Sequence, residues 1–158
     1  MSTRSFIGAM TESGRIGVYC HSDGYPTHNG RQVQAILKRD GFEKFLDVIL
    51  NQANQSGFSY LDAAETATGE NTLGDRAELI AGYGRVYRDC DAQPPQTLGS
   101  AMADDSWQEY GYVIRPDNTI EVYDFRPLVK RWVIGVDDPI DSDEAPDHAE
   151  MIERNAAV

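Results

Sequence analysis

The sequence predicts an α+β domain: a mainly antiparallel sheet, built from two hairpins, with two or three helices on one face. Two stretches of alternating residues predict the hairpins, and a helical periodicity between them predicts the helical layer. Acidic residues after the last strongly apolar run predict a mobile tail. We therefore expect a single domain over residues 1–136 and an acidic flexible tail over residues 137–158, whose deletion leaves the fold intact.

The first hairpin is expected over residues 4–21. Apolar and other residues alternate from Ile16 to Cys20, the two-residue period of a half-buried strand. Gly14 closes the turn before this strand, because glycine adopts positive φ readily.

Two helices are expected next. Asn29 is predicted to cap a helix over residues 30–40 that ends at Gly41. Over residues 42–53 the apolar residues recur at helical spacing, which predicts an amphipathic helix packed on the sheet. This stripe consists of Phe42, Phe45, Leu46, Ile49, Leu50 and Ala53.

The second half of the chain has a weaker pattern up to its second hairpin. A short helix is predicted over residues 75–83, and prolines interrupt the chain near residue 94. Alternation on both sides of a turn at residues 115–118 predicts the second hairpin, over residues 110–124. Residues 128–136 are expected to add a strand or a short helix.

The net charge of −12 is unevenly distributed. Residues 61–110 and residues 137–158 each carry −7, whereas residues 1–60 and residues 111–136 each carry +1. Nucleic-acid affinity comes largely from Lys and Arg, so this distribution argues against direct binding of nucleic acid and of anionic membranes. Acidic patches instead attract basic protein surfaces, although they also simply keep a protein soluble.

Composition also limits compartment and cofactor chemistry. No apolar run approaches the roughly 20 residues of a membrane span, and the N-terminus lacks a secretory signal, so we expect a cytoplasmic protein. Cys20 and Cys90 are expected to be reduced thiols, at least one of them buried. A metal site made of Cys20, His21 and His28 is disfavoured, because neighbouring strand residues point to opposite faces. No cofactor is expected.

The stretch from Tyr19 to Pro26 gathers a thiol, an imidazole, a hydroxyl, a carboxylate and a phenol where a strand runs into a loop. Turn chemistry alone explains part of it, with the Asp23 carboxylate accepting backbone amides and Gly24 adopting positive φ. A nucleophile reading pairs Cys20 or Ser22 with a histidine, but Cys20 falls on the apolar face of its strand and is expected to be buried and inert. An enzyme, such as a hydrolase, is therefore the less favoured interpretation.

The opening of the chain resembles a group of small bacteriophage and prophage proteins. The similarity covers about the first 30 residues and lies in Thr3-Arg4-Ser5, in the run Tyr19-Cys20-His21-Ser22-Asp23-Gly24-Tyr25-Pro26 and in Gly30. The resemblance implies a phage setting inside a bacterial host cell. Phage accessory proteins of this size are often non-enzymatic inhibitors of host machinery, including immune systems.

Two functions from different classes are therefore predicted. The first is a non-catalytic phage protein that binds and inhibits a host defence protein with a basic surface, by acidic mimicry of nucleic acid. Its partner-binding residues are predicted to be acidic side chains of the middle segment around one tryptophan, the hot-spot type of residue. They are Glu65, Glu70, Asp75, Glu78, Asp104, Asp105, Trp107 and Glu109.

The second function is binding or sequestration of a small ligand such as a nucleotide. Arginine contacts phosphate, aromatic rings stack on bases, and a helix N-terminus favours anions. The residues predicted for this site are Arg4, Tyr19, His21, Asp23, Tyr25 and Arg31.

Overall fold

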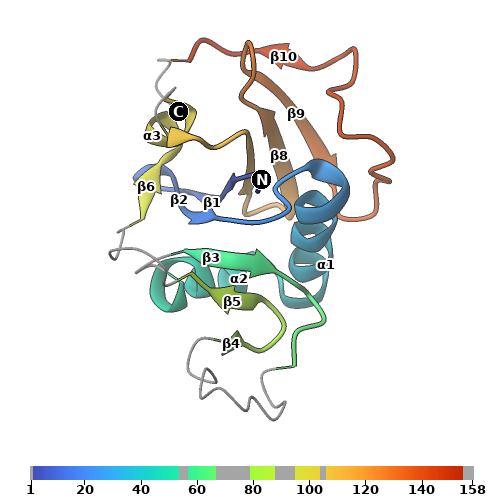
Figure 1. Ribbon diagram of the computed structural model, residues 1–158. Coiled ribbons are helices and arrows are strands. Elements are labelled where there is room, and N and C mark those ends of the chain that lie inside the picture. The colour runs from blue at the N-terminus through green and yellow to red at the C-terminus, as the bar shows by residue number, and fades with distance from the viewer. Residues whose placement is uncertain (1, 54–56, 67–78, 88–94, 104–105, 155–158) are drawn as a thin grey trace.

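The computed structural model describes residues 2–53, 57–66, 79–87, 95–103 and 106–154 (Figure 1). Its centre is one mixed sheet of ten strands in the order β10-β9-β8-β7-β1-β2-β3-β5-β4, with β6 paired to β2. The class of fold, helices packed on a sheet, is as predicted. The sheet is larger than two hairpins.

Parallel pairs occupy the middle of the sheet. β1 (Ser5–Thr11) and β2 (Gly14–Cys20) pair antiparallel around a turn in which Gly14 has φ 103°. β7 (Tyr110–Ile114) then lies parallel to β1, and β3 (Phe58–Leu61) lies parallel to β2. The two hairpin regions are thus joined edge to edge through β1 and β7.

The remaining strands extend the sheet on both sides. On one side β7 pairs with β8, β8 with β9 and β9 with β10, all antiparallel. These three strands are β8 (Thr119–Asp124), β9 (Lys130–Gly135) and β10 (Glu150–Met151). On the other side lie β4 (Leu79–Ile80), β5 (Gly84–Val86) and β6 (Gln96–Thr97).

The helix predicted over residues 75–83 is wrong in the part that the structure describes. Leu79–Ile80 form β4, and a turn leads from it into β5. Gly82 and Gly84 both have positive φ, which a helix cannot accommodate, and Tyr83 between them is buried.

One face of the sheet, here called the helical face, carries the N-terminal helices. They are the π-helical turn η1 (Pro26–Gly30), α1 (Arg31–Asp40), α2 (Phe42–Asp47) and the π-helical turn η2 (Val48–Gln52). Gly41, at φ 82°, separates α1 from α2. The predicted apolar stripe over residues 42–53 is confirmed, since its members are buried in, or packed against, the core of this face.

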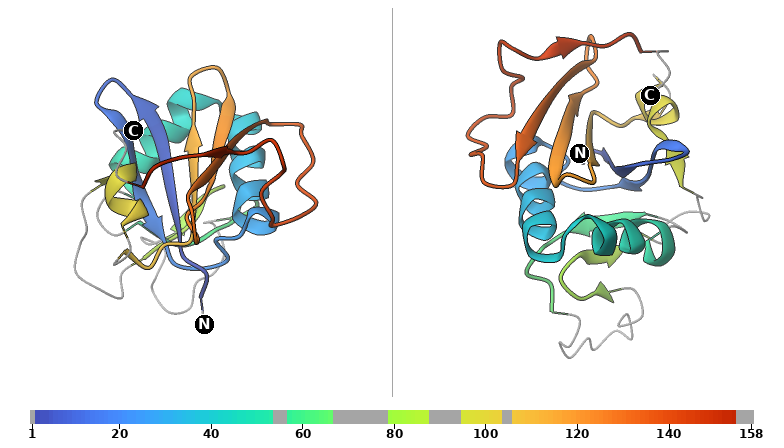
Figure 2. Two further views of the ribbon diagram at one scale, coloured as in Figure 1. Left: turned by 90° about the horizontal axis from the view of Figure 1, so that it is seen from above. Right: turned by 180° about the vertical axis from the view of Figure 1, so that it is seen from behind.

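The opposite face, here called the glycine face, carries α3 (Leu98–Met102), so the helices do not all lie on one face (Figure 2). A second, smaller core joins Phe6, Val113, Tyr123 and Phe125 to this helix. The Phe6 ring lies over Gly8 and Gly17, where an added Cβ would come within 2.5 and 2.7 Å of the ring, respectively.

Residues 137–154, here called the C-terminal strap, do not form the expected mobile tail. Arg31 donates two hydrogen bonds to the carbonyl oxygen of Ile140, and Gln34 donates to that of Asp138. β10 pairs with β9 near the other end, and Arg154 donates to the carbonyl oxygens of Met102, Phe125 and Pro127. Figure 1 shows the strap running around the β9 edge of the sheet.

The groups that hold the strap to the domain cannot be inferred from its acidic composition. Several of its carbonyl oxygens accept hydrogen bonds, while Ala145 and Ala149 pack on the core of the helical face and Ile152 packs on that of the glycine face. An acidic side chain also takes part, since the Asp143 Oδ1 accepts a hydrogen bond from the Thr27 N–H.

Candidate functional site

Three of the predicted ligand residues meet at one end of the glycine face. The Arg4 Nε donates to the Tyr19 hydroxyl oxygen at 2.9 Å, and that oxygen lies 2.6 Å from the His21 Nδ1. Tyr19 and His21 share a face because they stand two residues apart on an extended chain, and β1 brings Arg4 opposite them. All three side chains are partly exposed.

Tyr87 completes this group, here called the aromatic cluster, and the sequence did not predict it. Its ring stacks on His21 with centroids 4.8 Å apart and planes 14° apart, and lies 5.5 Å from the Tyr19 ring. The signal in the sequence is weak, because Tyr87 follows a three-residue strand. Only the pairing of β5 with β3, next to β2, brings it to His21.

Burial and the neighbouring Arg4 determine the protonation state of Tyr19 in the aromatic cluster. Burial raises the pKa of Tyr19 to about 12, against the opposing effect of the Arg4 charge. The phenol is therefore protonated at neutral pH and can donate to the His21 Nδ1 while it accepts from Arg4. The two Nη nitrogens of Arg4 have no hydrogen-bond partner among the described residues, so they can meet an anion.

Asp23 and Tyr25 form a separate pair on the loop after β2. The Tyr25 hydroxyl donates to the Asp23 Oδ1 at 3.1 Å. The predicted turn geometry is wrong in detail, since Asp23 rather than Gly24 has positive φ, at 55°. Gly24 is needed for a different reason: an added Cβ would lie 2.8 Å from the Thr3 carbonyl oxygen.

Asn29 is buried and does not cap α1. Gly30 occupies the cap position, and no side chain caps the helix. The Asn29 amide instead donates to the Ser5 hydroxyl, the Cys20 sulfur and the Ser22 carbonyl oxygen, at 3.1, 3.4 and 3.2 Å. The polar residues at this strand exit thus hold the loop to β1 and β2.

Cys20 is buried, as predicted, and it is not an activated nucleophile. Burial raises the pKa of its thiol to about 12, although Asn29 donates to the sulfur. The thiolate is the nucleophilic form, so this side chain is inert at neutral pH. No group of three or more His, Cys, Asp or Glu that could hold a metal ion occurs among the described residues. Cys90 lies outside them.

Arg31 is not part of the aromatic cluster, because its guanidinium holds the C-terminal strap. It donates two hydrogen bonds, at 3.0 and 2.6 Å, to the Ile140 carbonyl oxygen. The structure therefore brings together Arg4, Tyr19 and His21, pairs Asp23 with Tyr25, and uses Arg31 to hold the strap.

The structure describes only some of the predicted partner-binding residues. Trp107 is exposed, at 68%, and has φ 64°, a backbone conformation that bulky residues rarely adopt. Glu109 pairs with Arg126 at 3.5 Å, and Glu65 accepts a hydrogen bond from Tyr60. The others lie outside the described residues: Glu70, Asp75, Glu78, Asp104 and Asp105.

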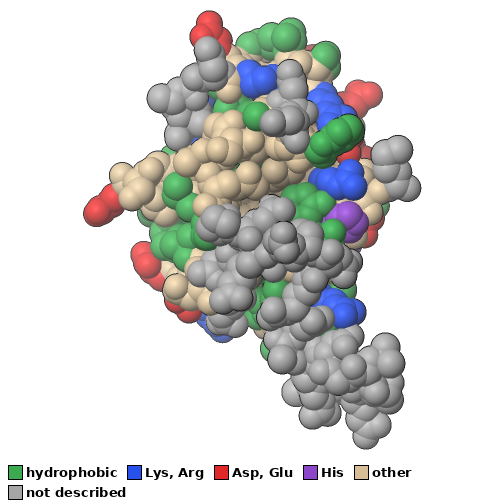
Figure 3. All heavy atoms as spheres, turned by 60° about the vertical axis from the view of Figure 1, so that its left-hand side comes forward, with side chains coloured by type: hydrophobic (Ala, Val, Ile, Leu, Met, Phe, Trp, Pro, Cys, Tyr) green, Lys and Arg blue, Asp and Glu red, His purple; other side chains and the backbone are tan. Residues whose placement is uncertain are grey.

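Trp107 and the aromatic cluster belong to the same end of the sheet. The Glu109 N–H, two residues after Trp107, donates to the Arg4 carbonyl oxygen at 2.8 Å. In Figure 3, basic, hydrophobic and histidine side chains adjoin along one side of the molecule.

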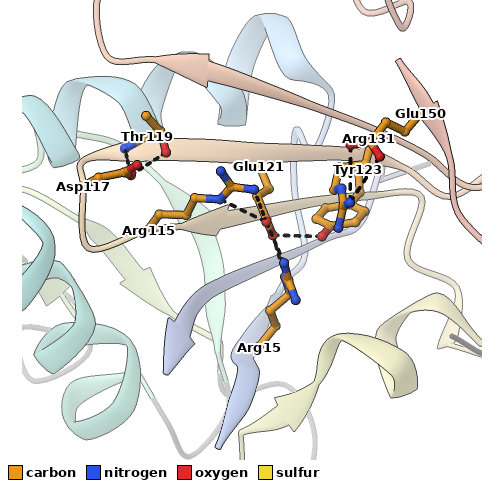
Figure 4. A network of polar contacts seen from close by, with 8 residues as sticks. All are labelled: Arg15, Arg115, Asp117, Thr119, Glu121, Tyr123, Arg131 and Glu150. Atoms are coloured by element: carbon orange, nitrogen blue, oxygen red, sulfur yellow. Dashed lines mark hydrogen bonds and ion pairs between the residues drawn. The ribbon is translucent and has the colours of Figure 1, made fainter. Parts of the chain in front are cut away.

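A charged network on the glycine face was not predicted at all (Figure 4). Glu121 is completely buried and accepts hydrogen bonds from Arg15 at 2.6 and 2.7 Å and from Arg115 at 3.0 and 2.6 Å. Tyr123 donates to the same carboxylate at 2.8 Å. Because all these donors favour the ionised form, the pKa of Glu121 falls to about 2 despite burial, so the network is structural rather than a source of protons.

No model of a protein family, no curated protein and no solved structure matches this chain. Among the described residues, no helix has both the length and the apolar character needed to cross a bilayer.

Proposed function

We propose that the protein is a non-catalytic binding protein that inhibits a partner protein, with Trp107 at the centre of the contact. The observation that carries this proposal is the exposed indole of Trp107 on a left-handed backbone. Such a conformation costs free energy, and strained residues concentrate at functional sites. Tryptophan is also the residue type most enriched among interface hot spots.

The chemistry of the candidate site supports a binding function. The Cys20 thiol and the Tyr19 phenol both have pKa values near 12, so neither supplies a nucleophile or a base at neutral pH. The net charge of −12 favours a partner with a basic surface. The resemblance of the first 30 residues to phage proteins suggests that this partner is a host defence protein, with acidic side chains in place of nucleic acid.

A photo-crosslinking amino acid at position 107 tests this proposal in a bacterial lysate. Position 128 is the matched control, because Leu128 is also a large exposed hydrophobic residue, at 58%. We expect a host protein to be crosslinked from position 107 only, with a yield that falls as salt rises. Crosslinking of the same proteins from both positions, or of none, would contradict the proposal.

Affinity for the crosslinked protein gives the quantitative test. Trp107→Ala should weaken binding by a factor of roughly 30 or more, the loss of a hot spot of about 2 kcal/mol, whereas Leu128→Ala should leave it unchanged. Equal losses would show that Trp107 is not the centre of the contact.

A second candidate function, binding of a nucleotide-like anion, rests on the aromatic cluster. Arg4 presents Nη nitrogens that have no hydrogen-bond partner among the described residues beside the stacked rings of His21 and Tyr87, which suits a phosphate attached to a planar base. Calorimetry against a nucleotide panel tests it, with Arg4→Gln and Tyr87→Leu as variants and Arg126→Gln as the control arginine. A hit that both variants abolish and the control retains favours this function; a hit recovered chemically changed indicates an enzyme.

A further inference from the structure

A cavity of about 480 Å³ lies between the C-terminal strap and the helical face of the sheet. None of the residues discussed for the proposed function lines it. Val122, Trp132 and Ile134 of β8 and β9 contribute sheet side chains to its wall. The strap contributes Pro139, Ile140 and Pro146, and Pro26 of η1 closes the lining on the helical side.

The strap is held firmly enough to define this cavity. The Ile140 side chain packs against η1, since a Cβ added to Gly30 would lie 3.1 Å from the Ile140 Cδ1. The Thr27 N–H donates to the Asp143 Oδ1 at 2.8 Å, and the Asp138 Oδ2 accepts from the Gly135 N–H at 2.6 Å. The walls are therefore formed by anchored segments on both sides, as expected for a pre-formed binding site.

The polar part of the lining is rich in acidic residues. Asp138, Asp141 and Glu144 contribute to it, together with Ser142 and His148. Among the described residues that line the cavity, none is Lys or Arg. Asp141 and Glu144 are exposed, and their carboxylates make no ion pair or hydrogen bond with the part of the chain that the structure describes, so both charges are available to a ligand.

Apolar walls and anionic polar groups together specify the chemistry of an occupant. A neutral apolar molecule would leave the carboxylates unused, and an anion would be repelled by them. A molecule with an apolar body and a cationic head would fill the apolar part and meet the carboxylates, and the indole of Trp132 adds a surface that attracts cations. We propose that this cavity is a binding site for a small organic cation of the alkylammonium type.

Hexylammonium, hexanol and hexanoate are the probes for a direct test, because they share a six-carbon body and differ in charge. The chain has two tryptophans, Trp107 and Trp132. In a Trp107→Phe background the fluorescence therefore reports on Trp132 in the cavity wall, and calorimetry gives the dissociation constants. We expect hexylammonium to bind at least about tenfold more tightly than hexanol, and hexanoate to bind more weakly than either.

The combined variant Asp141→Asn and Glu144→Gln tests the role of the two carboxylates. It should bring the affinity for hexylammonium close to that for hexanol and leave the affinity for hexanol unchanged. Its matched control is Asp147→Asn with Glu153→Gln, which removes the same charge from exposed positions of the strap that do not line this cavity. The control should retain the preference for the cation.

Three results would overturn the proposal. Equal affinity for the three probes would show an unspecific apolar cavity, and absence of binding to all three would show that the walls admit no ligand. An equal loss in the control variant would show that hexylammonium responds only to the net charge of the protein. None of these results depends on Trp107 as a partner contact, since that residue is Phe in every measurement.

Discussion

The two faces of the sheet are stabilised by different means. The helical face packs apolar side chains of α1, α2 and η2 against side chains such as Ile7, Val18 and Val122. The glycine face has a short helix, an aromatic ring over two glycines and a carboxylate held by two arginines. A helix that covers a sheet with an apolar stripe can therefore be predicted from periodicity. The ring, glycines and buried carboxylate of the glycine face leave almost no periodic signal in the sequence.

Deletion of the strap has the largest expected effect on stability, because the strap contacts both faces of the sheet. Deleting residues 137–158 removes the packing of Ile140, the β10 pairing and the hydrogen bonds of Arg154. We expect a loss of about 5 kcal/mol, which corresponds to roughly 10–20 °C in Tm for a chain of this size. Differential scanning calorimetry measures it, and an unchanged Tm would restore the interpretation of a mobile tail.

Substitution of Arg154 separates the contribution of the glycine face from the rest of the strap. Arg154→Ala should cost about 2 kcal/mol, since three backbone carbonyl oxygens lose their donor. Glu153→Ala, next to it and exposed, is the control and should leave Tm unchanged.

Glu121→Ala tests whether the charged network stabilises the glycine face. It leaves Arg15 and Arg115 facing each other without their shared carboxylate, so we expect a loss of about 3–5 kcal/mol in urea titrations. Glu43→Ala, an exposed carboxylate on α2, should change the free energy of unfolding by less than about 0.5 kcal/mol. Similar values for both variants would show that the network is only a surface feature.

Gly17→Ala tests the close approach of the Phe6 ring. The new Cβ would lie 2.4 Å from the Ile7 carbonyl oxygen and 2.7 Å from the ring, so strands and ring must move apart, at a cost of about 1–3 kcal/mol. Gly99→Ala in α3 is the control, because only the Thr97 Oγ1 at 3.8 Å lies near its Cβ. It should stabilise the protein by about 0.5–1 kcal/mol through helix propensity.

The pH dependence of stability isolates the contribution of the ionised Glu121 carboxylate. The pKa of Glu121 is lowered from 4.5 to about 2 in the folded protein, so its contribution is complete above pH 4.5 and is lost as pH falls toward 2. The difference in unfolding free energy between the wild type and Glu121→Gln should therefore shrink from pH 5 to pH 2.5. A difference that stays constant over this range would exclude ionisation of Glu121 as its source.

The sequence predicted what depends on local pattern. The stripe from Phe42 to Ala53 and the burial of Cys20 follow from periodicity, and the positive φ of Gly14 follows from turn chemistry. Arg4, Tyr19 and His21 could be grouped because two are near in sequence and the third pairs opposite them in the hairpin.

The remainder depends on contacts between distant residues. Tyr87 reaches His21 through the β3–β5 pairing, and Glu121 meets Arg15 across 106 positions of the chain. The strap docks mainly through carbonyl oxygens and small apolar residues, for which its acidic composition gives no sign. No local pattern encodes these partners, since each is defined by the neighbouring strand.

The parallel pairing of β1 with β7 has a consequence for synthesis of the chain. Ser5 pairs opposite Tyr110, so β1 and β2 leave the ribosome about one hundred residues before the strand that completes the sheet beside them. Until then the β1 edge is unpaired, and unpaired edges invite association with other chains. Such long-range pairing also slows folding, which lengthens the period in which the β1 edge of the nascent protein is exposed.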